Sequence, residues 1–273
     1  VSNLYYMYYA QAMNNSLYKN NDPAANIWAE HCEQAFKRDS MLCAAYNHDI
    51  AGGKWNGMMT QKHIGYKIWD DNFPHDMMPK VYRVTDTTNG GFTFSGNNGF
   101  VSMEAEHYYH AKSSNSKAEW TVIPYMGRTL SGMALMPYTK DVAGASLSYK
   151  MEIPKDITEV TVHIVVKSTL AFHDIKGHKY EVGFNGGNVE TINFNANLNE
   201  EPENVYTTLY PTVARRVVES QVKLELPISQ DGLQTLTLKP LDPGIVFEKI
   251  VVDFGGYRKT FLFMNESPCQ RNK

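Results

Sequence analysis

Side chains that could do chemistry are concentrated between residues 52 and 69. Two tryptophans, a tyrosine and two methionines alternate there with amide and imidazole groups. Flat aromatic rings can stack on a sugar ring, while amides and imidazoles can form hydrogen bonds with its hydroxyls. The alternative is that the same apolar residues pack the helices onto a neighbouring domain. The candidate carbohydrate-binding residues are Trp55, Asn56, Met58, Gln61, His63, Tyr66 and Trp69.

A second candidate site begins with Glu104 and Glu106, which are separated by one residue. On a strand they point to the same face, and two neighbouring carboxylates repel unless a cation or hydrogen-bond donors hold them. A calcium ion, which takes 6–8 oxygen ligands, is one solution. Asp253 ends the last long strand predicted and could join them if the first and last strands are neighbours. The alternative is a solvated sheet edge. The candidate metal ligands are therefore Glu104, Glu106 and Asp253, and no other cofactor is expected.

No pattern typical of a catalytic site is present. The sequence lacks a G-x-S-x-G elbow, a P-loop and an H-E-x-x-H motif, and no carboxylate pair stands out as a glycosidase acid and base. The net charge of −3 argues against a nucleic-acid binder. No apolar run approaches the roughly 20 residues that span a bilayer. We expect no nucleic-acid or membrane partner, and no enzyme activity from this chain by itself.

The first 53 residues show helical periodicity. Asp22-Pro23 is typical of a helix start, and apolar residues then recur at helical spacing until Gly52-Gly53. An apolar side also runs along the residues before Asp22, so we predict an antiparallel pair of helices that needs further packing to be stable. Cys32 and Cys43 would lie about 16 Å apart on one helix, which is too far for a disulfide. The three cysteines are predicted to be free thiols.

After Gly99 the pattern changes to a period of two with turn signals between short runs, which favours a sandwich or jelly roll. Before it, 81–84 and 92–94 flank Asn89-Gly90-Gly91 and suggest a short hairpin. The predicted fold class is α+β: a short helical segment followed by an antiparallel β-sandwich or jelly roll. The domains are 1–53 helical, 54–98 irregular linker, 99–265 sandwich and 266–273 tail. The predicted strands are 100–105, 118–123, 146–152, 159–167, 178–184, 188–194, 220–226, 233–239 and 245–253.

Several of these stretches resemble glycoside hydrolase family 115, the xylan α-1,2-glucuronidases. The run Ala51 to Tyr66, A-G-G-K-W-N-G-M-M-T-Q-K-H-I-G-Y, resembles a motif of that family, and Met78-Pro79 follows at the expected spacing. The stretches 100–105 and 236–256 are similar to the start and end of its C-terminal β domain, and Glu266-Ser267 to its closing tail. Gly57 stands where many members have His, and Asp71-Asn72-Phe73-Pro74 replaces a segment that is more often Gln-Pro-Pro.

The resemblance implies that the chain is the last part of the family's helical region plus its C-terminal sandwich. The parent reaction would be the hydrolysis, with inversion, of glucuronic acid or its 4-O-methyl ether from xylan, in the periplasm or outside a bacterial cell. The family's catalytic carboxylates lie upstream, so no catalytic residue is assigned here. The implied partners are the upstream catalytic domains, xylan or glucurono-xylo-oligosaccharides, and a second copy in a homodimer. The stretch Glu104-Ala105-Glu106 at the start of the predicted sandwich (the E-A-E start) also resembles that of calcium-binding jelly-roll carbohydrate modules.

The sequence is compatible with three alternative functions. The first is an accessory region of an α-glucuronidase that scaffolds the catalytic domain and lines the xylan groove through Trp55, Tyr66 and Trp69. The second is an autonomous carbohydrate-binding module, motivated by the sandwich and the E-A-E start. The third is a purely structural assembly domain, motivated by the tyrosine-rich first helix, whose exposed rings would mark a missing partner.

Overall fold

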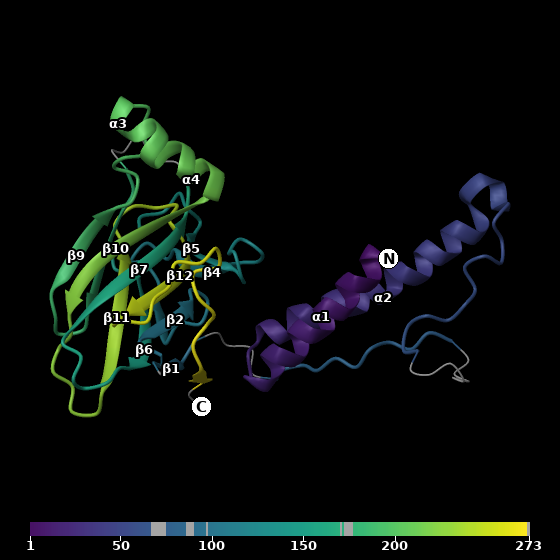
Figure 1. The fold of residues 1–273 in the computed structure, drawn as a ribbon, viewed down its shortest axis with the longest axis horizontal. Helices are drawn as coiled ribbons and strands as arrows, with labels where there is room; N and C mark the ends of the chain where they lie inside the picture. The colour runs from purple at the N-terminus through teal and green to yellow at the C-terminus, as the bar shows by residue number, and fades with distance from the viewer. Residues whose placement is uncertain (67–74, 86–89, 97, 170, 172–176, 272–273) are drawn as a thin grey trace. The chain divides into compact units, whose positions relative to one another are not determined.

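The chain forms two compact units, Val1–Thr88 and Asn89–Lys273. The fold is seen in a computed structural model that describes residues 1–66, 75–85, 90–96, 98–169, 171 and 177–271. The first unit holds two long helices and the second a β-sandwich (Figure 1). Each unit is described below by itself.

The helical unit is built on α1 (Ser2–Lys19) and α2 (Ala24–His48), which pack side by side in Figure 1. The Asp22 carboxylate accepts a hydrogen bond from the Ala24 N–H at 2.9 Å, which satisfies one of the free donors at the start of α2. A 3₁₀ turn at Ile50–Gly53 follows the helix, and Ala51 and Gly52 adopt φ of 54° and 62° there. Their left-handed backbone turns the chain back along the helices. The small core of this unit contains Met7, Ala10, Cys32, Ala35 and Ile64.

Three asparagines hold the irregular return segment against the helices, each through a pair of hydrogen bonds. Asn14 donates to the Tyr82 carbonyl at 2.8 Å and accepts from the Tyr82 N–H at 2.9 Å. Asn26 makes the same pair with Val84, and Asn47 with Met59, at distances of 2.8–3.0 Å. A side-chain amide thus supplies one donor and one acceptor to a backbone that has no strand partner. We call these residues the asparagine clamps.

The sandwich unit consists of two sheets. The first has the order β13-β1-β6-β11-β8-β9 with β3 also on β6, and the second has the order β10-β7-β12-β5-β4 with β2 also on β12. Nearly all neighbours are antiparallel, but β1 runs parallel to β6. The strands are β1 (Phe92–Ser95), β2 (Phe100–Glu104), β3 (His110–Lys112), β4 (Glu119–Ile123), β5 (Gly132–Met136), β6 (Ser146–Glu152), β7 (Glu159–Lys167), β8 (Lys179–Phe184), β9 (Val189–Asn193), β10 (Val217–Glu225), β11 (Leu233–Pro240), β12 (Val246–Asp253) and β13 (Cys269–Arg271).

The core lies between the two sheets and is built by alternate residues of their strands. Leu147, Tyr149 and Met151 of β6 are fully buried, and Val162 and Ile164 of β7 face them from the second sheet. A helical insertion joins β9 to β10 and consists of α3 (Pro202–Asn204), the π turn η2 (Val205–Leu209) and α4 (Tyr210–Arg215). Within the described residues, no helix is long and apolar enough to cross a membrane.

The predicted fold class is confirmed, and all nine predicted strands occur within a few residues of their expected ends. The hairpin of 81–84 with 92–94 is wrong, because Phe92–Ser95 pairs with β13 and β6 instead. The sandwich is also longer than 99–265, since β1 precedes it and the expected tail supplies β13. Cys32, Cys43 and Cys269, all described, form no disulfide with one another.

Candidate functional site

The segment after the 3₁₀ turn shapes an open groove of about 490 Å³. Of the sequence-predicted carbohydrate-binding residues, the structure brings Met58, Gln61, His63 and Tyr66 together there. Met58 and Tyr66 expose 65% and 44% of their surface, so their apolar faces are open to a ligand. The asparagine clamp at Asn47 fixes the groove to α2 through Met59. The groove is lined by Met58, Met59, Gln61, Lys62, His63 and Tyr66.

The other predicted residues of this segment lie outside the groove lining or outside the described residues. Trp55 is 37% exposed, and the Lys54 ammonium lies 5.0 Å from the centre of its ring. Asn56 is exposed, and its N–H bonds the Gly53 carbonyl in the turn that follows α2. Neither lines the groove. Trp69 falls outside the described residues. Four of the seven predicted residues thus line one groove, and sugar binding by any of the seven stays a prediction.

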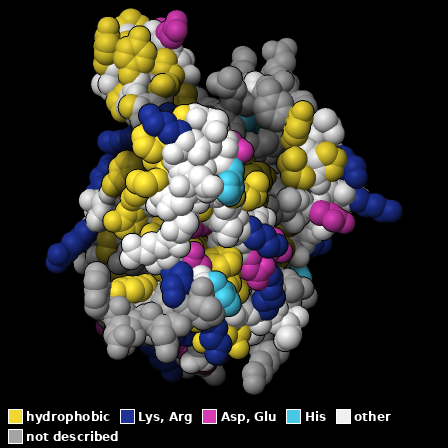
Figure 2. Space-filling model, turned by 90° about the vertical axis from the view of Figure 1, so that its right-hand side faces the viewer, with side chains coloured by type: hydrophobic (Ala, Val, Ile, Leu, Met, Phe, Trp, Pro, Cys, Tyr) yellow, Lys and Arg dark blue, Asp and Glu magenta, His cyan; other side chains and the backbone are white. Residues whose placement is uncertain are grey.

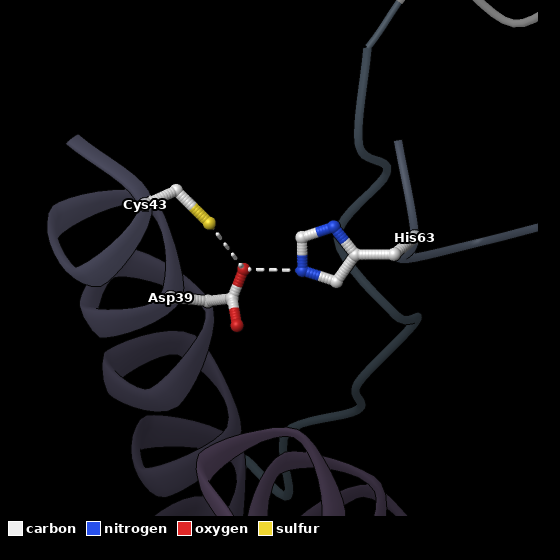
Figure 3. A group of neighbouring side chains, drawn as sticks. All are labelled: Asp39, Cys43 and His63. Atoms are coloured by element: carbon white, nitrogen blue, oxygen red, sulfur yellow. Dashed lines mark hydrogen bonds and ion pairs between the residues drawn. The ribbon is translucent and has the colours of Figure 1, made fainter. Parts of the chain in front are cut away.

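His63 is held in the groove through both ring nitrogens and its backbone. Its Nε2 lies 2.7 Å from the Asp39 carboxylate on α2, and its Nδ1 lies 3.1 Å from the Gln61 carbonyl. The Asp76 carboxylate accepts the backbone N–H groups of His63 and Ile64 at 2.6 and 2.7 Å. Figure 3 shows the imidazole pointing from its loop toward Asp39 and Cys43, which lie one turn apart on α2. Two carboxylates therefore position one imidazole and its backbone.

The charges around His63 alter two pKa values. Burial alone would lower the pKa of His63, but the hydrogen bonds to the Gln61 carbonyl and to Asp39, with the charges of Asp39 and Asp76, raise it above 6.5. Burial raises the pKa of the Cys43 thiol, and the same two carboxylates raise it further. The Cys43 Sγ lies 3.8 Å from the Asp39 carboxylate. The Asp39 and Asp76 carboxylates therefore favour the protonated forms of the His63 imidazole and the Cys43 thiol.

The family of the chain is decided by its sandwich unit. A family model described as the glycosyl hydrolase family 115 C-terminal domain matches residues 93–266, which is more than half of the chain. The chain belongs to glycosyl hydrolase family 115. The match begins in β1 and ends just before β13, so it covers the sandwich of this GH115 chain. The groove lies in the preceding unit, outside the matched residues.

The solved structures similar to the GH115 chain include one enzyme and two carbohydrate-binding modules. A family GH115 4-O-methyl-α-glucuronidase described as specific for decorated arabinogalactans is 16% identical, with a TM-score of 0.42, over 82% of this chain and 25% of its own. The C-terminal family 6 carbohydrate-binding module of a laminarinase from Zobellia galactanivorans is 11% identical, with a TM-score of 0.37, over 56% of this chain and 98% of its own. A family 35 module from Clostridium thermocellum is 10% identical, with a TM-score of 0.36, over 56% and 96%. No curated protein matches the chain significantly.

The GH115 chain thus spans about a quarter of the length of the similar enzyme. The activity of a whole enzyme is not attributed to this part of it.

In the GH115 sandwich, the Glu104 carboxylate is already paired with a positively charged side chain. Lys249 is its direct partner across β2 and β12, and the Lys249 ammonium lies 2.8 Å from the Glu104 carboxylate. Both side chains are only 4% exposed. The Thr129 hydroxyl also donates to Glu104, at 2.5 Å. A buried carboxylate needs such partners, because its charge is otherwise strongly disfavoured.

The other two predicted metal ligands have different surroundings. Glu106 is buried in the turn after β2 and accepts the Ser131 N–H at 3.2 Å. Asp253 lies opposite Phe100, four residues along β12 from Lys249, which is about 13 Å along a strand. Its carboxylate accepts the N–H groups of Gly255, Gly256 and Tyr257 and so closes a turn. The structure does not bring the three carboxylates together, and calcium binding stays a prediction.

Sequence reasoning missed Asp39, Cys43 and Asp76 as neighbours of His63. These are the partners that hold the imidazole, and among the described residues Asp39, Cys43 and His63 form the one group whose ligand atoms could surround a metal ion. The i, i+4 spacing of Asp39 and Cys43 on a predicted helix was a usable signal that they share a face. Nothing in the sequence places His63 beside them.

Proposed function

We propose that this chain is the accessory C-terminal region of a xylan α-1,2-glucuronidase and that its groove contacts the acidic sugar side chain. The observation that carries the proposal is the convergence of Met58, Gln61, His63 and Tyr66 on one groove. These residues belong to the segment 51–66 whose sequence resembles a GH115 motif, and the sandwich that follows matches that family.

The chemistry of the groove suits an acidic sugar. The methionines and Tyr66 offer an apolar floor for the face of a sugar ring, and Gln61 can bond its hydroxyls. Lys62 adds a positive charge at the same groove, which attracts the carboxylate of a glucuronic acid group. A neutral xylose chain could stack on the same apolar floor but would lack the attraction to Lys62.

The catalytic acid and base are expected in the upstream domains of the same protein. Glycosidic hydrolysis requires two positioned carboxyl groups flanking the bond, and none of the groove-lining residues is a carboxylic acid. We therefore expect no release of glucuronic acid from glucuronoxylan by this chain alone. The whole protein is expected in the periplasm or outside the cell, because polymeric xylan does not enter intact.

The test is a calorimetric titration of the whole chain with 4-O-methylglucuronosyl xylotriose and with neutral xylotriose. We expect binding of the acidic sugar, about tenfold weaker after Lys62→Gln, which corresponds to about 1.4 kcal/mol. Tyr66→Ala should weaken both sugars, since it removes the stacking face. Tyr206→Ala is the control, because Tyr206 is an exposed tyrosine of the sandwich unit and lies outside the groove lining.

Absence of binding by the folded chain, or equal binding by Tyr66→Ala and the unchanged chain, would reject the groove. A glucuronic-acid-decorated arabinogalactan oligosaccharide belongs in the same series, because the similar GH115 enzyme is described as specific for decorated arabinogalactans. Stronger binding of that sugar would support the groove as a binding site but would make arabinogalactan, rather than xylan, its polymer.

The homodimer, the autonomous binding module and the purely structural role stay predictions. The helical unit does expose apolar side chains that a partner could cover: Tyr5 is 73% exposed and Met41 71%. Figure 2 shows apolar side chains at the surface among charged and polar ones on one face of the molecule. Such exposure is consistent with docking onto the upstream domains of the same protein.

A further inference from the structure

We propose that Asp39, Cys43 and His63 together bind one divalent transition-metal ion, with zinc as the best match, beside the groove. Their carboxylate oxygen, thiol sulfur and imidazole nitrogen all lie within 4.8 Å of one another. Asp39 and Cys43 project from the same face of α2, and His63 reaches them from the loop (Figure 3). This proposal does not rest on the proposed sugar contact.

The first argument is the orientation of the imidazole. A histidine that binds zinc usually donates its other ring N–H to a carbonyl or carboxylate, which fixes the ring and turns the free lone pair toward the metal. In His63, Nδ1 faces the Gln61 carbonyl at 3.1 Å and the Asp76 carboxylate at 3.7 Å. This arrangement places the hydrogen on Nδ1 and leaves the lone pair of Nε2 facing Asp39 and Cys43.

The second argument is the short approach of Nε2 to Asp39. With Nδ1 carrying a hydrogen, the lone pairs of Nε2 and of the carboxylate oxygen face each other at 2.7 Å. Such an approach needs a cation between the two atoms, either a second proton on the ring or a metal ion. A tetrahedral zinc separates its nitrogen and oxygen ligands by about 3.3 Å, so the two atoms must move apart by about 0.6 Å.

The third argument is the set of ligand types. Sulfur, imidazole nitrogen and carboxylate oxygen together suit zinc, whereas calcium and magnesium prefer oxygen alone. The Cys43 Sγ lies 3.8 Å from the Asp39 oxygen, close to the roughly 3.6 Å between the sulfur and oxygen ligands of one zinc ion. Three protein ligands leave a fourth position. His63 also lines the groove, so that position is open to water or to a ligand in the groove.

The test is a titration of the untagged whole chain with Co²⁺, which takes zinc sites and reports a bound thiolate by a charge-transfer absorption. We expect one equivalent of Co²⁺ to bind with this absorption and Zn²⁺ to displace it. Cys43→Ser should abolish the band, and His63→Gln should weaken binding at least tenfold. Cys269→Ser, which removes a thiol of the sandwich unit, should leave the band unchanged.

A second measurement uses the unchanged chain and so does not depend on the folding of a variant. Zn²⁺ should slow the alkylation of Cys43 at least tenfold and leave that of Cys269 unchanged. Equal alkylation of Cys43 with and without Zn²⁺ would overturn the site, as would a thiolate band that persists in folded Cys43→Ser. Because no sugar is present, failure of the metal site leaves the groove proposal standing, and loss of sugar binding leaves the metal site standing.

Discussion

At the scale of single residues, one buried carboxylate of the sandwich shows how its charge is stabilised by partners. Glu219 of β10 is 8% exposed and accepts hydrogen bonds from His163 Nδ1 at 3.0 Å and from the Tyr257 hydroxyl at 2.8 Å. The His163 and Tyr257 rings stack with centres 3.9 Å apart. Burial alone would raise the pKa of Glu219, but these two hydrogen bonds, together with the charges of His163 and Lys259, outweigh it and lower the pKa below 4.5.

This lowered pKa makes part of the stability depend on pH. Because the folded pKa of Glu219 lies below the unfolded value, its contribution is fully present above the unfolded pKa, and it is lost as the pH falls through the folded pKa. We expect Glu219→Gln to lower the free energy of unfolding by about 1–3 kcal/mol at pH 7. The difference from the unchanged chain should shrink between about pH 5 and pH 3, as followed by thermal unfolding.

Glu159→Gln is the matched control, since Glu159 is 57% exposed and pairs with the exposed Lys223 at 3.4 Å. Such surface pairs contribute about 0–1 kcal/mol, so this variant should follow the unchanged chain at every pH. A Glu219→Gln chain whose deficit is the same at pH 7 and pH 3 would show that the carboxylate charge is not what stabilises the network.

The partners of the buried charges could not be predicted from the sequence. The strand at 100–105 and the alternation of Glu104 and Glu106 were readable, because they depend on neighbours along the chain. Lys249 becomes the partner of Glu104 only through the register of β2 on β12. Without this ammonium, Glu104 would need another cation or more hydrogen-bond donors, which is why the sequence alone suggested a metal ion.

At the scale of elements, the asparagine clamps fix a segment that has no regular structure. Asn47→Ala removes both hydrogen bonds to Met59 but leaves a good helix former in α2. We expect the segment around Met59 to open more easily, by about 1–3 kcal/mol, with α2 intact. Amide hydrogen exchange should show faster exchange at Met59 and little change within α2.

Two further variants sharpen this test. Asn47→Asp can still accept the Met59 N–H but cannot donate to its carbonyl, so its exchange rate should lie between those of Asn47→Ala and the unchanged chain. Asn3→Ala removes a single hydrogen bond, to the Ala35 carbonyl, and should leave Met59 unaffected. Unchanged exchange at Met59 in Asn47→Ala would mean that packing rather than the clamp holds the segment.

Element prediction succeeded where the period could be seen and failed where it could not. The nine predicted strands are each at least five residues long, and most of them alternate, although β12 is almost fully buried. Strands β3 and β13 have three residues, too few for a period, and β5 is an almost fully buried run without alternation. The clamps and the contact of His63 with α2 join residues 12–68 positions apart, so no local pattern announces them.

At the scale of the whole molecule, the two units differ greatly in how much core they possess. The sandwich buries an extensive core between its sheets, with Tyr149, Tyr180 and Phe247 almost fully enclosed. The helical unit has two small clusters instead, one around Met7 and Ile64 and one around Leu17 and Val84. A small unit buries a smaller share of its surface on folding and is correspondingly less stable. The sequence predicted this division into helices and sandwich, although it placed the boundary ten residues too late.

We therefore expect the whole chain to unfold in two steps, with the helical unit first. The far-ultraviolet signal of α1 and α2 should be lost at a lower temperature than the near-ultraviolet signal of the sandwich tyrosines. A shortened chain of residues 90–273 should keep the upper transition within a few degrees, because its core contains no residue of the helical unit. A single transition shared by both signals, together with a much lower midpoint for the shortened chain, would mean that the helical unit stabilises the sandwich directly. In that case the scaffold role proposed toward the upstream domains would begin within this chain itself.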